Sequence, residues 1–173
     1  ARAAMDSGVA TRPIQDFHAY EQQLERFVFR SVFVMRQIFA HARKAPRRVI
    51  YADGEDERVL RAAQVLTEDR IAYPILVGRP AVIETRLKRF GLGLKLGRDV
   101  QVVNPEDDPR YRDYVADYVA FAGRKGITPE AARTLVRTSN TVIAALALRR
   151  GEADAMICGL EGRYRSKLRH IKD

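Results

Sequence analysis

The chain has 173 residues, 46% of them hydrophobic and 31% charged, which fits one globular domain with a core of ordinary size. Its single cysteine, Cys158, excludes an intrachain disulfide framework and a cysteine-built zinc site, and favours a reducing compartment. The formal net charge of +9 favours anionic partners in general, namely nucleic acid, anionic lipid or a phosphorylated small molecule, and does not choose among them.

The start of the chain, residues 1–15, is small and polar, and is expected to be a tail or linker. It lacks the apolar core of a signal peptide, and no stretch of the sequence approaches the roughly 18 uninterrupted apolar residues of a membrane span. We therefore expect a cytoplasmic protein with no membrane partner.

A long helical segment is predicted over residues 17–42, because apolar residues recur at steps of three or four along one face. The residues of this expected core face are Phe17, Tyr20, Leu24, Phe27, Ser31, Met35, Ile38 and Ala42. A second apolar group covers the other sides of the helix and comprises Val28, Phe29, Val32, Phe33 and Val34. A helix that is apolar nearly all round is buried by more than one neighbour, so we expect a second body here, either another domain or a second copy.

From Arg47 onward, short apolar runs alternate with helical patterns. Strands are predicted over residues 49–52, 73–77, 100–103 and 155–158, and helices over residues 55–69, 80–90, 109–121, 129–138 and 140–149. This alternation is typical of an α/β fold with a parallel sheet sandwiched by helices. The expected organisation is therefore a linker and helical segment over residues 1–46, followed by an α/β body over residues 47–173.

The segment GEDER, residues 54–58, joins the first predicted strand to a helix, which is the usual frame of a phosphate-binding loop. Its carboxylates lie where the helix N-terminus carries partial positive charge, so they satisfy free N–H groups themselves and repel a bound phosphate. We therefore interpret GEDER as a helix cap. Arg58 remains a candidate ligand-binding residue, because it stands just inside the cap near the carboxyl end of a strand, where ligands bind in open parallel sheets.

Three other patterns are weaker candidates for chemistry. The glycines of FGLGLKLG, residues 90–97, follow a helix and precede a strand, which is the reverse of a dinucleotide fingerprint. The acids of NPEDD, residues 104–108, are interpreted as a cap for the next helix, with metal binding as the less favoured alternative. The three isolated histidines and Cys158 show no spacing that suggests a catalytic triad, so no catalytic residue and no metal ligand is assigned.

The richest stretch is CGLEGRYRSKLRH, residues 158–170, directly after the last predicted strand. Its basic residues fall at alternate positions and are Arg163, Arg165, Lys167 and Arg169. In an extended segment all four point to one side, which gives an anion-binding row at the mouth of the sheet. A solvated basic loop is the structural alternative. Nucleic-acid binding is disfavoured, because only Tyr164 is interleaved with these charges and no recognition motif is present.

Four ordered motifs resemble one known family. They are GEDERVLRAA, ILVGRPAVIETRLK, GRKGITPEAA and GEADAMICGL, at residues 54–63, 75–88, 123–132 and 151–160. Together they resemble the phosphate acetyltransferase domain, in the version fused to the C-terminus of bacterial hybrid NADP-dependent malic enzymes. The opening MDSGVATRPIQDFHAYEQQL, residues 5–24, resembles the segment that leaves the catalytic part of those hybrids.

The resemblance implies a Rossmann-like fold of the phosphate acetyltransferase and isocitrate dehydrogenase type, with only its first part in residues 47–173. It also implies that residues 1–46 connect this part to a malic enzyme catalytic part, whose NADP and Mg or Mn sites lie outside the chain. No cofactor is therefore expected within the chain itself. The parent protein is expected to decarboxylate malate oxidatively to pyruvate and CO2.

Two departures from the transferase pattern follow from the same resemblance. An arginine of those enzymes falls at Ala122, and their small, serine-rich loop after the last strand is replaced by residues 161–165. Arg169 still matches the arginine at the end of that loop. The active cleft of the transferases also needs a second domain with a serine, an arginine and an aspartate, which are expected beyond the chain.

The leading hypothesis is thus an acetyl-CoA-sensing and oligomerising domain of an NADP-dependent malic enzyme, with acetyl-CoA as effector and a homo-oligomer as the assembly. The effector-binding residues under this hypothesis are Arg58, Arg163, Arg165, Lys167 and Arg169. The enzymatic alternative is a phosphate acetyltransferase, which moves acetyl between CoA and phosphate. The non-enzymatic alternative is a basic scaffold that only oligomerises.

Overall fold

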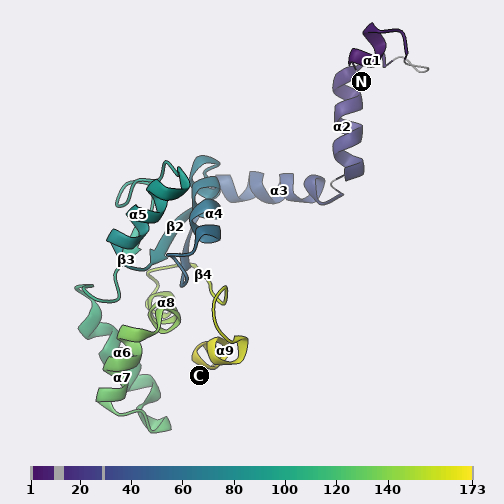
Figure 1. Cartoon of the computed structure of the whole chain (residues 1–173). Coiled ribbons are helices and arrows are strands. Elements are labelled where there is room, and N and C mark those ends of the chain that lie inside the picture. Colours follow the sequence, from purple (N-terminus) through teal and green to yellow (C-terminus); the bar gives the residue numbers. More distant parts are fainter. Residues whose placement is uncertain (1, 10–13, 29, 173) are drawn as a thin grey trace. The chain divides into compact units, whose positions relative to one another are not determined.

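The computed structural model of the chain describes residues 2–9, 14–28 and 30–172. Its internal contacts divide it into two compact units, Ala1–His41 and Ala42–Asp173. The described part of the first unit is helical, and the second unit contains the sheet (Figure 1).

The first unit holds α1 (Arg2–Asp6), α2 (Phe17–Val28) and the greater part of α3 (Arg30–Lys44). Asp16 determines where α2 begins, because its Oδ1 accepts the N–H groups of His18 and Ala19 at 2.9 and 3.1 Å. The sequence predicted one helix over residues 17–42. The structure has two helices there, and residue 29 between them lies outside the described residues.

The predicted core face of this segment is wrong for two of its members. Leu24 and Ile38 are 45% and 50% exposed, because an amphipathic helix buries its apolar side only against a neighbour, and the described residues provide none over these two side chains. The half-buried members are Phe17, Tyr20, Met35 and Ala42. The side chains of Phe27, Ser31 and the whole second apolar group lie outside the described residues.

The second unit alternates strands and helices, as predicted. Its strands are β1 (Arg47–Tyr51), β2 (Ala72–Val77), β3 (Gln101–Val103) and β4 (Ala155–Ile157). Its helices are α4 (Glu57–Glu68), α5 (Pro80–Phe90), α6 (Tyr111–Ala122), the 3-10 turn η1 (Gly123–Lys125), α7 (Pro129–Thr138), α8 (Asn140–Arg149) and α9 (Tyr164–Lys172). Among the described residues, no helix has the length and apolar character that a membrane span requires.

The strands form one parallel sheet in the order β3-β2-β1-β4. Val49 of β1 lies opposite both Pro74 of β2 and Ala155 of β4, so β1 is a central strand. Proline lacks the N–H that a ladder uses, and β2 tolerates Pro74 because β3 begins opposite Ile75, so no β3 residue pairs with Pro74.

Helices cover both faces of this sheet, which confirms the predicted fold class (Figure 1). Successive strand residues point to opposite faces, so Ile50 and Tyr51 enter different cores. One core lies between the sheet and α6, α7 and α8, and its buried members include Ile50, Ile75, Val77, Tyr114, Val136 and Ile143. The other lies between the sheet and α4 and α5, and includes Tyr51, Leu76, Val59, Leu60, Ile83 and Leu87.

Local signals explain where the helices begin and end. Pro80 occupies the first turn of α5, where its missing N–H costs little, and Gly91 ends that helix with a left-handed φ of 65°. Thr128 caps α7 by accepting the N–H of Ala131 at 3.2 Å. Pro80 thus lets α5 begin three residues after the end of β2, and Thr128 fixes the start of α7 after η1.

Candidate functional site

The carboxyl ends of the described strands meet at one edge of the sheet, because all the strands are parallel. The chain moves from β1 outward to β2 and β3, and then returns to the far side of β1 as β4. The strand order therefore reverses between β1 and β4. Ligands of open α/β sheets bind in the crevice outside the carboxyl ends at such a reversal, so a binding site is expected at this edge.

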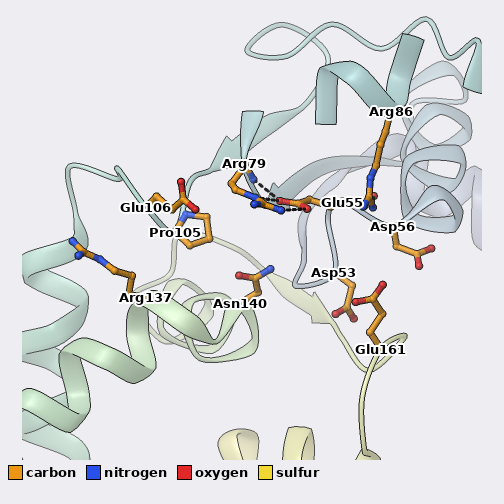
Figure 2. Close-up of a pocket in the computed structure, with 10 residues that line it drawn as sticks. All are labelled: Asp53, Glu55, Asp56, Arg79, Arg86, Pro105, Glu106, Arg137, Asn140 and Glu161. Carbon is orange, nitrogen blue, oxygen red and sulfur yellow. Dashed lines mark hydrogen bonds and ion pairs between the residues drawn. The ribbon is translucent and has the colours of Figure 1, made fainter. Parts of the chain in front are cut away.

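A cavity of about 250 Å³ lies at this edge, and we name it the carboxyl-edge cavity (Figure 2). Loops after the strands, α5 and the adjoining ends of α7 and α8 supply its lining. The lining residues are Asp53, Glu55, Asp56, Arg79, Arg86, Pro105, Glu106, Arg137, Asn140 and Glu161. Five carboxylates thus accompany three guanidinium groups, so the cavity lacks the cationic surplus that favours a phosphorylated ligand.

Glu55 binds two arginines of the carboxyl-edge cavity. Arg79 donates to its carboxylate from the backbone N, Nε and Nη2, at 2.9, 3.0 and 3.0 Å (Figure 2). Arg86 Nη1 donates to the Glu55 carbonyl oxygen. The hydrogen bonds from Arg79 hold the pKa of the Glu55 carboxyl below its ordinary value, although burial opposes them. Glu55 thus fixes the loop after β1 to the start of α5 and engages the charge of Arg79.

The interpretation of GEDER as a helix cap is confirmed. Asp56 is the N-cap of α4, and its Oδ1 accepts the Arg58 N–H at 2.8 Å. The Arg58 guanidinium pairs with the same carboxylate, since Nε lies 2.9 Å from Oδ1 and Nη2 lies 2.9 Å from Oδ2. This hydrogen-bonded pair is the main cause that raises the pKa of Arg58, and the Glu161 and Asp53 carboxylates add to it. Arg58 therefore lies within electrostatic reach of the reversal point.

Asp53 joins the loop after β1 to the loop after β4. Its Oδ2 accepts the backbone N–H groups of Gly159 and Leu160, both at 3.0 Å. Lys167 Nζ lies 3.7 Å from the other carboxylate oxygen, and the Asp53 side chain is only 8% exposed. The neighbouring Cys158 is partly buried, and burial together with the Asp53 charge raises the pKa of its thiol. A raised thiol pKa disfavours the nucleophilic thiolate at Cys158.

The predicted extended conformation of the basic row is wrong, because residues 164–172 form helix α9. Gly159 and Gly162 have positive φ values of 100° and 84°, so the chain turns away from the direction of β4 before α9 begins. Side chains of a helix turn by about 100° per residue, so alternate positions point to nearly opposite sides. Arg163 precedes α9, and the helix places Lys167 on the side opposite to Arg165 and Arg169.

The structure places the five predicted effector residues in different surroundings. Arg58 pairs with Asp56, and Lys167 pairs with Asp53. Arg163, Arg165 and Arg169 are all exposed, and of these three Arg169 lines a second cavity. The structure thus brings Arg58 and Lys167 toward the same reversal point, and leaves the other three apart from it.

The second cavity, of about 420 Å³, lies among α6, η1, α7 and α9, and we name it the helical cavity. Its lining residues are Tyr118, Phe121, Ala122, Lys125, Ile127, Leu135, Ser166, Arg169 and His170. Lys125 Nζ lies 5.2 Å from the centroid of the Phe121 ring. Aromatic and aliphatic walls thus meet two cationic groups, and no carboxylate stands among these lining residues. Such a lining suits a ligand with apolar and anionic parts.

The other patterns weighed in the sequence take structural roles. The FGLGLKLG segment connects α5 to β3, as predicted. The interpretation of the NPEDD acids as a cap for the next helix is wrong, because the N-cap of α6 is Arg110 and no side chain makes a cap hydrogen bond there. Asp108 instead accepts the Arg110 N–H at 2.9 Å and pairs with its guanidinium at 2.8 Å. Across the described residues, no group of three or more His, Cys, Asp or Glu side chains has an arrangement that holds a metal ion.

Residues 33–173 match the family described as phosphate acetyl/butaryl transferase. The chain belongs to this family. The four motifs that suggested the resemblance all lie in the matched range. The malic enzyme part of the resemblance is confirmed by curated relatives that match 100% of the chain.

The NAD-dependent malic enzyme of Rhizobium meliloti (strain 1021) is 65% identical over 174 residues, which is 100% of the chain and 22% of that protein. The NADP-dependent malic enzyme of Escherichia coli (strain K12) is 47% identical over 173 residues, which is 100% of the chain and 23% of that protein. A phosphate acetyltransferase of Nitratidesulfovibrio vulgaris is 32% identical over 118 residues, or 68% of the chain. The chain thus spans less than a quarter of the length of these malic enzymes.

Two solved structures share the fold. A phosphotransacetylase from Streptococcus pyogenes matches with a TM-score of 0.67 and 24% identity, over 78% of this chain and 41% of its own. The EutD phosphotransacetylase from Staphylococcus aureus matches with a TM-score of 0.68 and 21% identity, over 79% of this chain and 42% of its own. At these identities the likeness shows the fold alone, and it agrees with the predicted phosphate acetyltransferase type.

Within this transferase-like domain, Ala122 is buried and lines the helical cavity that Arg169 also lines. Ala122, which replaces an arginine of the transferases, and Arg169, which matches one of their arginines, therefore line the same cavity. An arginine at residue 122 would add a guanidinium to this wall, and alanine leaves the wall apolar.

Sequence reasoning missed several residues of the carboxyl-edge cavity, namely Arg79, Arg86, Arg137 and Asn140. Arg79 could have been predicted from the sequence, because it follows β2 almost directly and so lies at the carboxyl edge of the sheet, where ligands bind. Arg86 and Arg137 lie on helices, and Arg137 is held 4.9 Å above the Tyr111 ring. Only the tertiary packing of those helices brings them to the cavity.

Proposed function

We propose that this chain is a regulatory segment of a malic enzyme, where it binds acetyl-CoA and supports assembly of a homo-oligomer. The observation that carries the proposal is the extent of the matches. Malic enzymes match 100% of the chain, whereas the phosphate acetyltransferases of Nitratidesulfovibrio vulgaris and Escherichia coli match 68% and 71%. The family match likewise begins only at residue 33. The helical start of the chain is thus shared with malic enzymes, which supports residues 1–46 as the connection to a catalytic part.

The parent protein of this proposal decarboxylates malate oxidatively to pyruvate and CO2 in the cytoplasm. Its nicotinamide coenzyme and its Mg or Mn ion bind in the catalytic part, outside the chain. NADP is the coenzyme expected from the resemblance, but the relative with 65% identity is named NAD-dependent and the one with 47% is named NADP-dependent. Steady-state rates with NAD and with NADP on the full-length protein identify the coenzyme, and a clear preference for NAD overturns the NADP assignment.

Acetyl-CoA combines phosphate groups with an apolar pantetheine and acyl arm, and the helical cavity offers groups that complement both. Lys125 and Arg169 supply positive charge, and Phe121 and Leu135 supply apolar wall. The volume of about 420 Å³ lies in the usual range of small-molecule sites. Among the predicted effector residues, this geometry favours Arg169. The assignments of Arg58, Arg163, Arg165 and Lys167 stay predictions.

The test is calorimetric titration of acetyl-CoA into the full-length protein and into this chain. Arg169→Ala is expected to weaken binding by about tenfold or more, because it removes a charge-assisted contact of about 1 to 3 kcal/mol. Arg165→Ala is the matched control, since it removes the same charge from the same helix at a position that does not line the helical cavity. Equal losses in both variants overturn the cavity assignment, and no binding to the full-length protein overturns acetyl-CoA sensing.

Acetyl transfer to phosphate is the second candidate function, and the family match favours it. Ala122 argues against it, because the transferases that the sequence resembles carry an arginine there. Formation of acetyl phosphate from acetyl-CoA and phosphate by the full-length protein decides between the two. An oligomer whose malate oxidation ignores acetyl-CoA supports the scaffold alternative, for which the exposed Leu24 and Ile38 are the relevant observation.

A further inference from the structure

The surroundings of the Asp53 carboxylate have the features of an anion-binding site. Two consecutive backbone N–H groups, those of Gly159 and Leu160, converge on one oxygen at 3.0 Å each. The φ of 100° at Gly159 is a conformation that side chains disfavour, and here it accompanies two N–H groups that point the same way. Concave groups of successive N–H donors of this kind bind phosphate and carboxylate.

Two side-chain cations complete these surroundings. Lys167 Nζ lies 3.7 Å from the second oxygen of Asp53, and the Arg58 guanidinium lies within electrostatic reach of the same carboxylate. We name the two N–H groups and the Lys167 ammonium the Asp53 niche. It lies between the ends of β1 and β4, where the strand order reverses and where doubly wound sheets bind their ligands.

We propose that the Asp53 niche is an anion site for a phosphate or carboxylate group, and that the chain's own Asp53 carboxylate occupies it and excludes external anions. The Asp53 side chain is 8% exposed, so its carboxylate fills the niche almost completely. A tethered carboxylate competes at a high effective concentration, and a free phosphate at millimolar concentration does not displace it. Asp53 is thus an autoinhibitory contact, because it occupies the N–H groups of Gly159 and Leu160 and the Lys167 ammonium.

The charges around the niche explain why the removal of Asp53 is expected to raise the affinity of the niche for an external anion. The nearby cations are Arg58 and Lys167, and the other nearby carboxylates are Asp56 and Glu161. Asp56 is engaged by Arg58, and Glu161 lines the carboxyl-edge cavity on the side of Asp53 (Figure 2). With Asp53 present the group carries a net negative charge, and without it the charges balance while two N–H donors lose their acceptor. An external anion is then the partner that these donors require.

The test measures binding of inorganic phosphate to the full chain and to two variants. Asp53→Ala empties the niche, and Asp69→Ala is the matched control, because Asp69 also pairs with a basic side chain, Arg43 at 3.3 Å, but lies just before the amino end of β2, away from the carboxyl ends of the strands. Phosphate is expected to bind Asp53→Ala at least about tenfold more tightly than it binds the wild-type chain or the control. In spectra of amide-labelled protein, the signals of Gly159 and Leu160 are expected to shift with phosphate only in Asp53→Ala.

A second substitution tests whether phosphate binds through the niche or only through the general positive charge of the chain. Lys167→Ala added to Asp53→Ala is expected to abolish the gain in phosphate affinity, whereas Arg165→Ala added to it leaves most of the gain. Should Asp53→Ala fail to fold, Asp53→Ser replaces it, since its hydroxyl still accepts one N–H group. The proposal is overturned if the folded variant binds phosphate no better than the control, or if both Asp53→Ala and Asp53→Ser unfold. In either case Asp53 serves only to anchor the loop. The inference does not depend on acetyl-CoA binding, because its probe is phosphate and its site is not the helical cavity.

Discussion

Arg48 and Asp154 join β1 to β4 at the amino-terminal side of the strand pair. The Arg48 backbone N donates to Asp154 Oδ2 at 2.8 Å, and the Asp154 backbone N donates to the Arg48 carbonyl at 2.8 Å. The Arg48 guanidinium adds a contact from Nη2 to Asp154 Oδ1 at 2.9 Å and reaches the Gly151 carbonyl at 2.9 Å. One residue pair thus closes the register between the first and the last strand of the sheet, which are more than 100 residues apart in the chain.

This pair predicts a pH dependence of stability. The side-chain hydrogen bonds from Arg48 lower the pKa of Asp154 to about 2, from an ordinary value of 3.8. A carboxyl whose pKa is depressed in the folded state contributes stability above its ordinary pKa, and this contribution is lost as the pH falls toward 2. Carboxyl titration by NMR is expected to give about 2 for Asp154, and Arg48→Met is expected to move the value back toward 3.8. An unchanged value in Arg48→Met contradicts the assignment.

Tyr114 is expected to stabilise the domain through a buried hydrogen bond. Its hydroxyl donates to Glu152 Oε2 at 2.6 Å, its ring is 1% exposed, and Arg110 Nη1 holds the same carboxylate oxygen at 2.6 Å. Tyr114→Phe is expected to lower the free energy of unfolding by about 1 to 2 kcal/mol, measured by urea denaturation. Tyr73→Phe is the control, because Tyr73 is 61% exposed, and its expected change is below about 0.5 kcal/mol.

Tyr114 also predicts a loss of stability at alkaline pH. Burial and the hydrogen bond to Glu152 raise the pKa of Tyr114 above its ordinary value of 10.0. The folded state therefore holds the proton more tightly than the unfolded state, so the contribution of Tyr114 to stability is complete below pH 10 and falls as the pH rises above it. A difference in stability between wild type and Tyr114→Phe that stays constant from pH 9 to 11 contradicts this account.

Asp56 tests the helix cap that the sequence predicted. Asp56→Ala removes the acceptor of the Arg58 N–H, and the loss of an N-cap side chain lowers the free energy of unfolding by about 1 kcal/mol. Asp107→Ala removes an acidic side chain that is exposed and is not a helix N-cap, so its expected change is smaller. Equal changes in the free energy of unfolding of the two variants would show that Asp56 stabilises the domain only through its charge and not as a helix cap.

Most of the fold was predictable because its signals are local. Val49 and Ile75 lie in short apolar runs, Pro80 opens a helix, and Asp56 caps one, and each of these signals involves only a few neighbouring residues. The parallel sheet then follows, since strands that alternate with helices must run in one direction to pack. The predicted ends of the elements were off by one or two residues, as at β1, because fraying and capping decide them.

The predicted extended conformation of the basic row was wrong for a physical reason. Charged residues at alternate positions are compatible with both an extended segment and a helix, and only a pairing partner in the sheet selects the extended form. Residues after Ile157 have no such partner among the described strands, so Arg165 and Lys167 follow their good helix propensity. The contacts of Asp53 were likewise unpredictable, because Lys167 lies more than 100 residues away in the chain.

Gly54 is the residue of GEDER whose substitution is expected to cost most. A Cβ at this position would lie 2.7 Å from the Val77 carbonyl oxygen and 2.9 Å from Leu76 Cβ, because the loop after β1 passes close to the end of β2. The Gly54 N–H donates to that same carbonyl at 3.2 Å, so the loop cannot move away without breaking the contact. Gly54→Ala is therefore expected to lower the free energy of unfolding by about 1 to 3 kcal/mol in urea denaturation. Gly93→Ala is the matched control, because its Cβ meets nothing within 4 Å, and its expected change is below about 0.5 kcal/mol. Similar stability of the two variants would mean that the loop after β1 yields easily and does not fix the carboxyl-edge cavity.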